Sequence, residues 1–555
     1  MEIFREIGIE EIVANARPDM LESGNITWAV SLAGRELGRC SPLADDYPRM
    51  AVVSPTRTTQ FPQNRLEPLF WSRLEETSGI VFYKRHQAEA ITQADGVVRV
   101  EFTDLDSGKK KGVKARYLIA CDGSASGTRD ALGIDSVGDD LQNMIGIHFS
   151  ADLGRFIENR RSMLYWILNR RVLGVLIAHW PPSEWVLFTP SFPPSLTLEQ
   201  FTGARCEELI HQAIGTSSIA DLKIEGAGAW MLGARLAEKY RQGRVFLAGD
   251  AAHIFPPTGG LGLNTGVQDA HNLAWKLGAV LRGDAQEGLL DSYESERRPV
   301  ARRNLEHSVS NYERMNELIG FLGLDMKGFK TLAGVQASWP FRIFPAAWKR
   351  SLVSRGVKIA LGRLAPLDEF GPKAEKARAH FRGLVPGQSP HYRFMGLDLG
   401  FAYQKGAIIP DAVPTPEPEY GVQDYLPTTR PGSRLPHVHV LRKGVSLSNH
   451  DLIDPHGYLL FTHPEGQADW IEAARVLQGE ISMPVTCLSI GRTNEADLMD
   501  ERGAWERLSE VDPTGAVLVR PDGHVAWRSV RLPTSPVDEL RGVLVMLGCR
   551  GRKEA

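Results

Sequence analysis

The sequence is poor in the features that mark several large classes of protein. Its 555 residues include only five cysteines, which are scattered and never form a Cys-x-x-Cys pair. An odd number of scattered cysteines argues against a disulfide framework, and the lack of paired thiols argues against a metal knuckle or a dithiol redox centre. We therefore expect a reducing compartment and predict a cytoplasmic protein without a bound metal.

Long apolar runs and blocks of one charge are also missing. The formal net charge is −3 and no segment carries a block of one sign, so neither nucleic acid nor a membrane surface is expected as a partner. No apolar run reaches the length of a membrane span. The first 20 residues space Phe4 and four isoleucines as in one amphipathic helix, and they lack the basic start and apolar core of a signal peptide.

What the chain does have is length, apolar residues and a distinctive glycine-rich segment. Hydrophobic residues make up 43% of the chain and charged residues 24%, as in a soluble protein of two or three domains. The stretch "GRVFLAGDAAHIFPPTGGLGLNTG", residues 243–266, reads as a buried parallel strand, an acidic residue, a Pro/Gly loop and the start of a helix. Asp250 falls at the carboxyl end of the strand, where open α/β sheets bind ligands.

The chemistry of this loop suits a ring system that becomes anionic, such as a reduced flavin. Glycines let the backbone approach a ligand closely, and a helix N-terminus directs free N–H groups and a positive dipole end at it. The Asp250 carboxylate would accept hydrogen bonds from a polyol. The simpler alternative is that Asp250 caps a helix and the glycines only form a turn. Asp250 and His253 are too few ligands for a metal ion, and His253 is expected to be a packed structural residue.

Together with "YLIACDGSASGTR" and "FPQNRLEPLF", this loop resembles the motifs of the single-component flavin-dependent aromatic hydroxylases. The resemblance leans toward the phenol and 2,4-dichlorophenol monooxygenase branch. It implies that Asp250 holds the ribityl chain of FAD and that Asp122 and Gly123 lie near its pyrophosphate. The other cofactor-binding residues that it implies are Gln63 beside the flavin, Pro257 in the wall of the site, and Gly259, Gly262, Leu263 and Asn264 at the pyrimidine edge.

The resemblance also implies a fold and a division into domains. We expect an α/β protein with a Rossmann-like parallel sheet for FAD, a β-sheet domain for the substrate and a C-terminal thioredoxin-like domain. The predicted segments are 1–145 and 236–320 for the FAD-binding domain, 146–235 for the substrate domain, 321–430 for a helical segment with a Pro-rich connector, and 431–555 for the thioredoxin-like domain.

The first motif of that family, GxGxxG on a βαβ unit, is absent from these residues. In relatives the segment like "MEIFREIGIE" follows that unit, so we expect an N-terminally truncated FAD-binding sheet, through a misassigned start or a real truncation. Because the missing loop supplies donors for the FAD pyrophosphate, this chain is expected to bind FAD weakly or not at all. A non-catalytic remnant that no longer binds FAD therefore stays open beside the enzyme.

By resemblance, the reaction is hydroxylation of a phenolic ring with FAD, molecular oxygen, and NADPH or NADH as the transient electron donor. A related activity on polyketide-like aromatics stays open, because the FAD motifs are shared. In "SMLYWIL", strand alternation puts Tyr165 and Trp166 on opposite faces. Tyr165 is our candidate for hydrogen bonding to the phenol, and a core position is the alternative. No catalytic base is identified, and a homodimer is left open.

Overall fold

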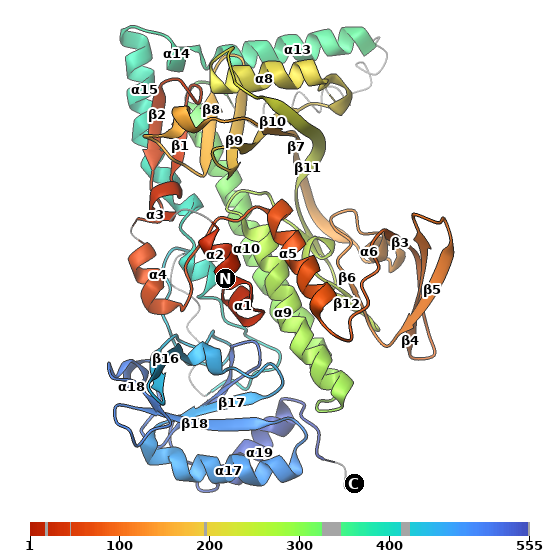
Figure 1. Ribbon diagram of the computed structural model, residues 1–555, viewed down its shortest axis with the longest axis vertical. Helices are drawn as coiled ribbons and strands as arrows, with labels where there is room; N and C mark the ends of the chain where they lie inside the picture. Colours follow the sequence, from red (N-terminus) through yellow and green to blue (C-terminus); the bar gives the residue numbers. More distant parts are fainter. Residues whose placement is uncertain (17–19, 45, 194–196, 325–345, 412–421, 553–555) are drawn as a thin grey trace.

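The computed structural model describes the chain except for residues 17–19, 45, 194–196, 325–345, 412–421 and 553–555. The elements form three tiers (Figure 1). An eight-stranded sheet with its covering helices lies at the top, two long helices run through the middle, and a smaller α/β domain lies at the bottom. The architecture is thus α/β with several mixed sheets. No helix among the described residues is both long and apolar enough to cross a membrane.

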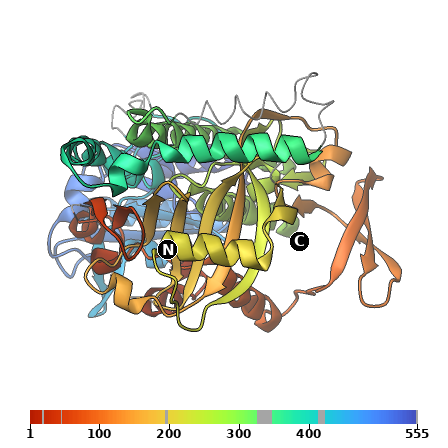
Figure 2. The ribbon, with the colours of Figure 1, turned by 90° about the horizontal axis from the view of Figure 1, so that it is seen from above.

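The upper sheet has the strand order β14-β11-β7-β10-β9-β8-β1-β2. Helix α8 (Gly203–Ile214) lies across one of its faces, as Figure 2 shows, and fills a hydrophobic cluster there. The β-sheet expected for the middle segment is present in the structure. The strands of this sheet are β1 (Ile26–Ala29), β2 (Glu36–Cys40), β7 (Ser136–Ser150), β8 (Leu164–Leu168), β9 (Leu173–Trp180), β10 (Glu184–Ser191), β11 (Lys223–Ala237) and β14 (His253–Ile254).

Two small sheets lie beside the long helices. One contains β6 (Leu118–Ala120), β13 (Val245–Leu247) and β12 (Arg241–Gln242), in the order β12-β13-β6. The parallel strand predicted before Asp250 is present as β13, which pairs in parallel with β6. Strand β13 is fully buried, whereas β6 is not, because it is the edge strand and leaves Ile119 43% exposed. The other sheet is the antiparallel set β3 (His86–Ala94), β4 (Val97–Asp104) and β5 (Lys110–Ala115).

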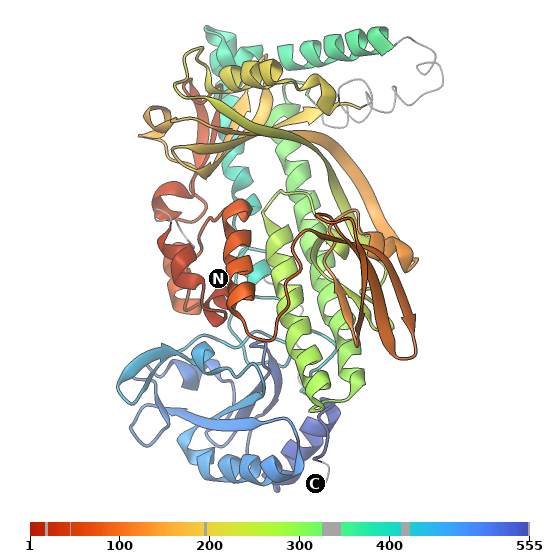
Figure 3. The ribbon, with the colours of Figure 1, turned by 45° about the vertical axis from the view of Figure 1, so that its right-hand side comes forward.

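The long helices α9 (Leu261–Arg282) and α10 (Ser292–Gly320) run side by side from the upper sheet to the lower domain (Figure 3). The N-terminal segment packs next to them, but as two short helices, α1 (Glu2–Glu6) and α2 (Glu10–Asn15). The prediction of one continuous helix is therefore wrong. The break falls at Gly8, whose φ of +75° lies in the left-handed region that ends helices.

The remaining segments complete the top and bottom tiers. Within residues 321–430, the described part holds α13 (Ala346–Gly362), α14 (Ala365–Asp368) and α15 (Pro372–Leu384). Much of the predicted Pro-rich connector, residues 412–421, lies outside the described residues. The lower domain is a seven-stranded mixed sheet, in the order β16-β15-β19-β18-β17-β20-β21, with α17 (Gln467–Glu480) and α19 (Pro536–Met546) packed together. Its strands are β15 (His439–Arg442), β16 (Val445–Ser448), β17 (Tyr458–Thr462), β18 (Val485–Gly491), β19 (Leu498–Met499), β20 (Ala516–Val519) and β21 (Val525–Ser529).

Candidate functional site

Two of the predicted motifs meet at the ends of neighbouring parallel strands. In the pairing of β6 with β13, Ala120 lies opposite Leu247, and the next backbone N–H, of Ala248, donates to the carbonyl of Ala120 at 3.0 Å. Asp122 and Asp250 follow these two strands directly. Because parallel strands point their carboxyl ends the same way, both aspartate turns lie at one edge of the sheet.

The turn at Asp122 is held by its own side chain. Its carboxylate accepts hydrogen bonds from Ser126 Oγ at 2.5 Å and from the Thr128 N–H at 2.9 Å. Partial burial alone would raise the pKa of Asp122, but these bonds lower it below its usual value, so the group is ionised at neutral pH. Gly123 has a φ of +80°, a conformation that a residue with a side chain rarely adopts.

Arg129 joins this turn to the second motif. Ser126 caps helix α6 (Gly127–Ala131) by accepting from the Arg129 N–H, which fixes the start of the side chain. The buried guanidinium then donates to the carbonyl of Ser124 and to that of Ala251, each at 3.2 Å. Two sequence segments more than a hundred residues apart are thereby held as one surface.

The glycine-rich loop leads into an uncapped helix. Gly260 is the N-cap of α9 with a φ of +67°, and no side chain in the described part of the chain caps the helix. A Cβ added at Gly260 or Gly262 would meet no atom of the described residues within 4 Å, so space is open above the loop. Asp250, Pro257, Leu263 and Asn264 are exposed around this space. The arrangement leaves backbone donors and a positive dipole end facing outward.

The loop is fixed from below and from the side. Thr258 Oγ1 donates to the carbonyl of Ser308 on α10 at 2.6 Å. His253 is buried, stacks on Phe255 and bonds through Nε2 to Asp269 at 2.7 Å, so it is the packed residue that the sequence suggested and not an exposed ligand. Strand β14, which carries His253, pairs with β11 of the upper sheet. The loop is therefore attached to both the helices and the eight-stranded sheet.

Gln63 lies on the first turn of α5 (Gln63–Glu76), beside this region but not bonded to it. Its side-chain amide donates to Glu67 at 2.6 Å, and the residue is exposed. One turn further, Leu66 shares a hydrophobic cluster with Val267 on α9, so α5 packs near the first turns of that helix. The structure thus places Gln63 near the loop without a contact between them.

Tyr165 lies in the core of the upper sheet, away from any open space. It is 1% exposed, and across the strands it lies in one row with Leu176, Leu187 and Ile147 on the face that α8 covers. Its hydroxyl accepts from the Ser162 N–H at 2.9 Å and donates to the carbonyl of Arg160 at 3.0 Å. The core alternative that the sequence left open fits this placement, because no hydroxyl donor remains for a phenol.

Substituting Tyr165→Phe is expected to lower the free energy of unfolding by about 1–2 kcal/mol, since a buried N–H loses its acceptor. The KM for an aromatic substrate should stay unchanged. Urea unfolding and steady-state kinetics of the same preparation check both statements. A rise in KM of tenfold or more with unchanged stability would show that Tyr165 binds the substrate.

Models of two known families match the chain at opposite ends. Residues 1–308 match the FAD binding domain, and residues 428–547 match the aromatic-ring hydroxylase C-terminal domain. The first match covers both aspartate turns and the glycine loop, the residues already found together at one edge of the sheet. The chain belongs to the FAD-binding aromatic-ring hydroxylases, the class A flavin monooxygenases.

Curated relatives and solved structures of this hydroxylase family match over nearly the whole chain. The 2,4-dichlorophenol 6-monooxygenase of Cupriavidus pinatubonensis is 32% identical, over 97% of this chain and 87% of the relative. A putative polyketide hydroxylase of Streptomyces halstedii is 33% identical, over 95% and 84%. The crystal structure of the flavin-dependent monooxygenase PieE in complex with FAD and substrate is 30% identical and covers 98% of this chain and 90% of that one, with a TM-score of 0.82.

The residues of this hydroxylase fit a flavin beside the start of α9. The uncapped N–H groups of Leu261, Gly262 and Leu263 suit a ring edge that carries negative charge, and the open space at the glycines admits a flat group. The exposed Asp250 carboxylate makes no hydrogen bond to another described residue, which leaves it available to hydroxyl groups. Partial burial raises the pKa of Asp250, while the neighbouring His253 acts in the opposite direction.

In protein that has bound FAD, Asp250→Ala is expected to weaken the affinity about ten- to hundredfold, the effect of losing a hydrogen bond to a charged group worth about 1.5–3 kcal/mol. Quenching of flavin fluorescence during a titration measures this directly. Asp95→Asn, which removes the same charge from an exposed hairpin turn, is the matched control. Equal FAD affinities of the two variants would show that Asp250 does not bind the cofactor.

Sequence reasoning missed the residues that hold the site together. Asp269 and Arg297 are completely buried below the loop and bond to each other at 2.8 Å. Both lie in helical segments whose charged residues look solvent-exposed when read alone. No local signal marks Asp269 or Arg297, because their burial depends on partners that are distant in the sequence.

Proposed function

We propose that this hydroxylase adds one oxygen atom to a phenolic ring, next to the phenol hydroxyl, using molecular oxygen, FAD and NADPH or NADH. The observation that carries the proposal is the composition of the four central strands of the upper sheet, which present one face opposite α8. Strands β7, β8, β9 and β10 contain no lysine or arginine. A benzoate would need a cation to pair with its carboxylate, whereas a neutral phenol would not.

This face is apolar and aromatic, and it is only partly covered. The strand register aligns Trp166, Val175, Phe188 and Gly146 in one row. The Phe188 ring lies over Gly146, where an added Cβ would come within 2.7 Å of it, and it meets Trp230 edge to face at 5.3 Å. Aromatic rings in this geometry would favour a flat aromatic substrate.

Trp230 adds a polar group to the same face. Its indole N–H is buried and has no hydrogen-bond partner among the described residues. A buried donor without an acceptor is costly, so a substrate oxygen that accepts from it would be bound favourably. Further along its strand, β11 pairs with β14, which follows Asp250, so the strand that carries Trp230 is joined to the glycine loop.

When bound, FAD would supply the redox chemistry that uses the nicotinamide electron donor and oxygen. The residues of the chain would bind and orient. Asp250 would accept hydrogen bonds from hydroxyl groups of the cofactor, and the start of α9 would stabilise negative charge at the ring edge. Phe188 and Trp230 would hold the substrate ring and keep water away from the reacting carbon.

A polyketide-like aromatic is the second candidate substrate. The aromatic row crosses four strands, and a putative polyketide hydroxylase is as similar to this chain as a dichlorophenol monooxygenase. Loss of FAD binding, with retention of the fold, is the non-catalytic alternative. It is supported if a titration of the chain with FAD shows no binding.

For protein with bound FAD, Trp230→Phe is expected to raise the KM for phenol or 2,4-dichlorophenol about two- to tenfold, the effect of one hydrogen bond. Trp505→Phe, which removes another buried indole N–H without a partner from the lower domain, should leave the KM unchanged. Oxygen uptake and product mass are compared for phenol, 2,4-dichlorophenol, hydroxybenzoate and a polycyclic phenol. Hydroxylation of hydroxybenzoate alone would contradict the substrate assignment. Hydroxylation of the polycyclic phenol alone would favour the polyketide-like aromatic as the substrate.

A further inference from the structure

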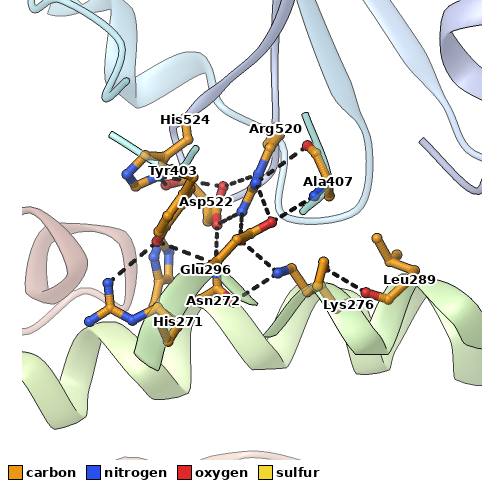
Figure 4. A network of polar contacts seen from close by, with 12 residues as sticks. His271, Asn272, Lys276, Leu289, Glu296, Tyr403, Ala407, Arg520, Asp522 and His524 are labelled. Carbon is orange, nitrogen blue, oxygen red and sulfur yellow. Dashed lines mark hydrogen bonds and ion pairs between the residues drawn. The ribbon is translucent and has the colours of Figure 1, made fainter. Parts of the chain in front are cut away.

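A cluster of ionised side chains is buried where the lower domain meets the long helices. Arg520, just after β20, donates to both carboxylate oxygens of Glu296 on α10, at 2.9 and 2.8 Å, and to Asp522 at 2.9 Å. All three side chains are at most 1% exposed. Figure 4 shows Arg520 and Asp522 reaching from the lower domain toward Glu296 on the helices.

The cluster extends along α9 through two further side chains. Lys276 donates to Glu296 at 2.7 Å and to Asn272 at 2.9 Å. The amide of Asn272 lies within bonding distance of Glu296, of Asp522 at 3.1 Å and of the Tyr403 hydroxyl at 3.3 Å. Asn272 thus contacts groups from both the helices and the lower domain (Figure 4).

The next residue on α10 carries the connection to the glycine loop. Arg297 donates to the Tyr403 hydroxyl at 3.4 Å and to Asp269 at 2.8 Å. The other oxygen of Asp269 accepts from His253 at 2.7 Å and from the Gly249 N–H at 3.3 Å. Hydrogen bonds therefore run without a break from Arg520 to the backbone immediately before Asp250.

The ionised side chains between Arg520 and Gly249 depend on one another for their charge. They comprise three cations, Arg520, Lys276 and Arg297, and three carboxylates, Glu296, Asp522 and Asp269. Burial alone would raise the pKa of Glu296, but Arg520 and Lys276 hold it at about 2. In a water-poor interior, removing one charge leaves its neighbours unpaired, and those side chains then change position. A change at Arg520 therefore alters the other groups in this series of contacts.

We propose that Arg520 and Asp522 are positioning residues for the segment 249–266, so that the lower domain fixes the loop that faces the flavin. The assignment of that loop to the flavin rests on the proposed function, but the mechanical connection does not. Without Arg520, Glu296 and Asp522 lose the cation that holds them, and Asn272, which bonds to both carboxylates, loses fixed acceptors. Tyr403 and Arg297 then shift, and the Gly249 N–H loses a rigid acceptor. The lower domain then contributes to the site although it supplies no residue to it.

Hydrogen–deuterium exchange of the full chain without cofactor tests the connection. In Arg520→Gln, peptides from 249–266 should exchange at least tenfold faster, while peptides from 173–191 in the upper sheet should not change. Arg528→Gln is the matched control, because Arg528 is a buried arginine of the same domain that pairs with Asp411 and Glu510 outside this chain of contacts. It should leave 249–266 unchanged.

Unchanged exchange of 249–266 in Arg520→Gln would overturn the proposal. So would an equal acceleration by Arg528→Gln, because that would reflect general loosening of the domain. If Arg520→Gln does not fold, Arg520→Lys keeps the charge but loses the two-pronged contact to Glu296, and its exchange is judged by the same criteria. Failure of the chain to bind FAD would contradict the proposed function but would leave this result intact.

Discussion

Replacing Asp269 by alanine is expected to lower the free energy of unfolding by about 3–5 kcal/mol, the cost of breaking a buried ion pair by removing one partner. Asp269 is completely buried, and its oxygens accept from Arg297, His253 and the Gly249 N–H. Burial alone would raise the pKa of Asp269, but His253 and Arg297 lower it, so the group is ionised. Alanine leaves the Arg297 charge without a counterion in a site closed to water.

Urea unfolding at neutral pH measures this loss. Asp538→Ala is the control, because Asp538 also pairs with an arginine but is 71% exposed, and such surface pairs contribute at most about 1 kcal/mol. A loss below 1 kcal/mol for Asp269→Ala would mean that water or another group compensates Arg297, and the chain of buried charges would not be continuous.

Acidification from pH 7 to pH 5 is expected to destabilise the folded protein by about 2–4 kcal/mol. Burial lowers the pKa of His391 and His437 to about 3 and of His307 to about 4. These histidines are neutral in the folded protein. In the unfolded chain, histidine has its ordinary pKa of about 6.5, so these side chains take up protons when the pH falls below that value. Since the unfolded state binds more protons, stability falls with pH through this window, by about 1–2 kcal/mol for each histidine.

Groups whose pKa is raised in the folded protein act in the opposite direction. Burial raises the pKa of Asp398 to about 7, and the contact with Glu6 outweighs burial to raise the pKa of His271, so both gain protons on folding as the pH falls. They offset part of the loss but not the combined effect of the buried histidines. Urea unfolding at pH 7 and pH 5 tests the net sign, and His391→Gln should reduce the difference. Equal or greater stability at pH 5 would show that the buried histidines are already charged.

The sequence was sufficient for features that are encoded locally. The apolar run before Asp250 predicted a parallel strand, and the structure contains it as β13, paired with β6. A strand with Tyr165 and Trp166 was predicted as well, but alternation alone cannot tell which face is covered. That depends on α8, which comes some forty residues later and packs on the Tyr165 side. The break at Gly8 was missed because the apolar spacing continues across it.

Features that depend on distant residues could not be predicted. Arg520 and Glu296 are 224 residues apart and belong to different domains, so neither segment indicates the other. Read locally, the charged residues of α9 and α10 suggest an exposed face, and only the docking of the lower domain makes burial of Lys276, Glu296 and Arg297 favourable. The same holds for Arg129, whose contact with Ala251 requires β6 and β13 to be paired first.

The most direct test of the account is the fate of isotopically labelled oxygen. Protein shown by its absorbance to hold FAD is incubated with NADPH or NADH, 2,4-dichlorophenol and ¹⁸O₂, and the product is analysed by mass spectrometry. The account predicts a catechol with one ¹⁸O atom next to the original hydroxyl, formed only when FAD and the electron donor are present. Consumption of the electron donor by flavin-loaded protein without incorporation of ¹⁸O into 2,4-dichlorophenol would contradict it.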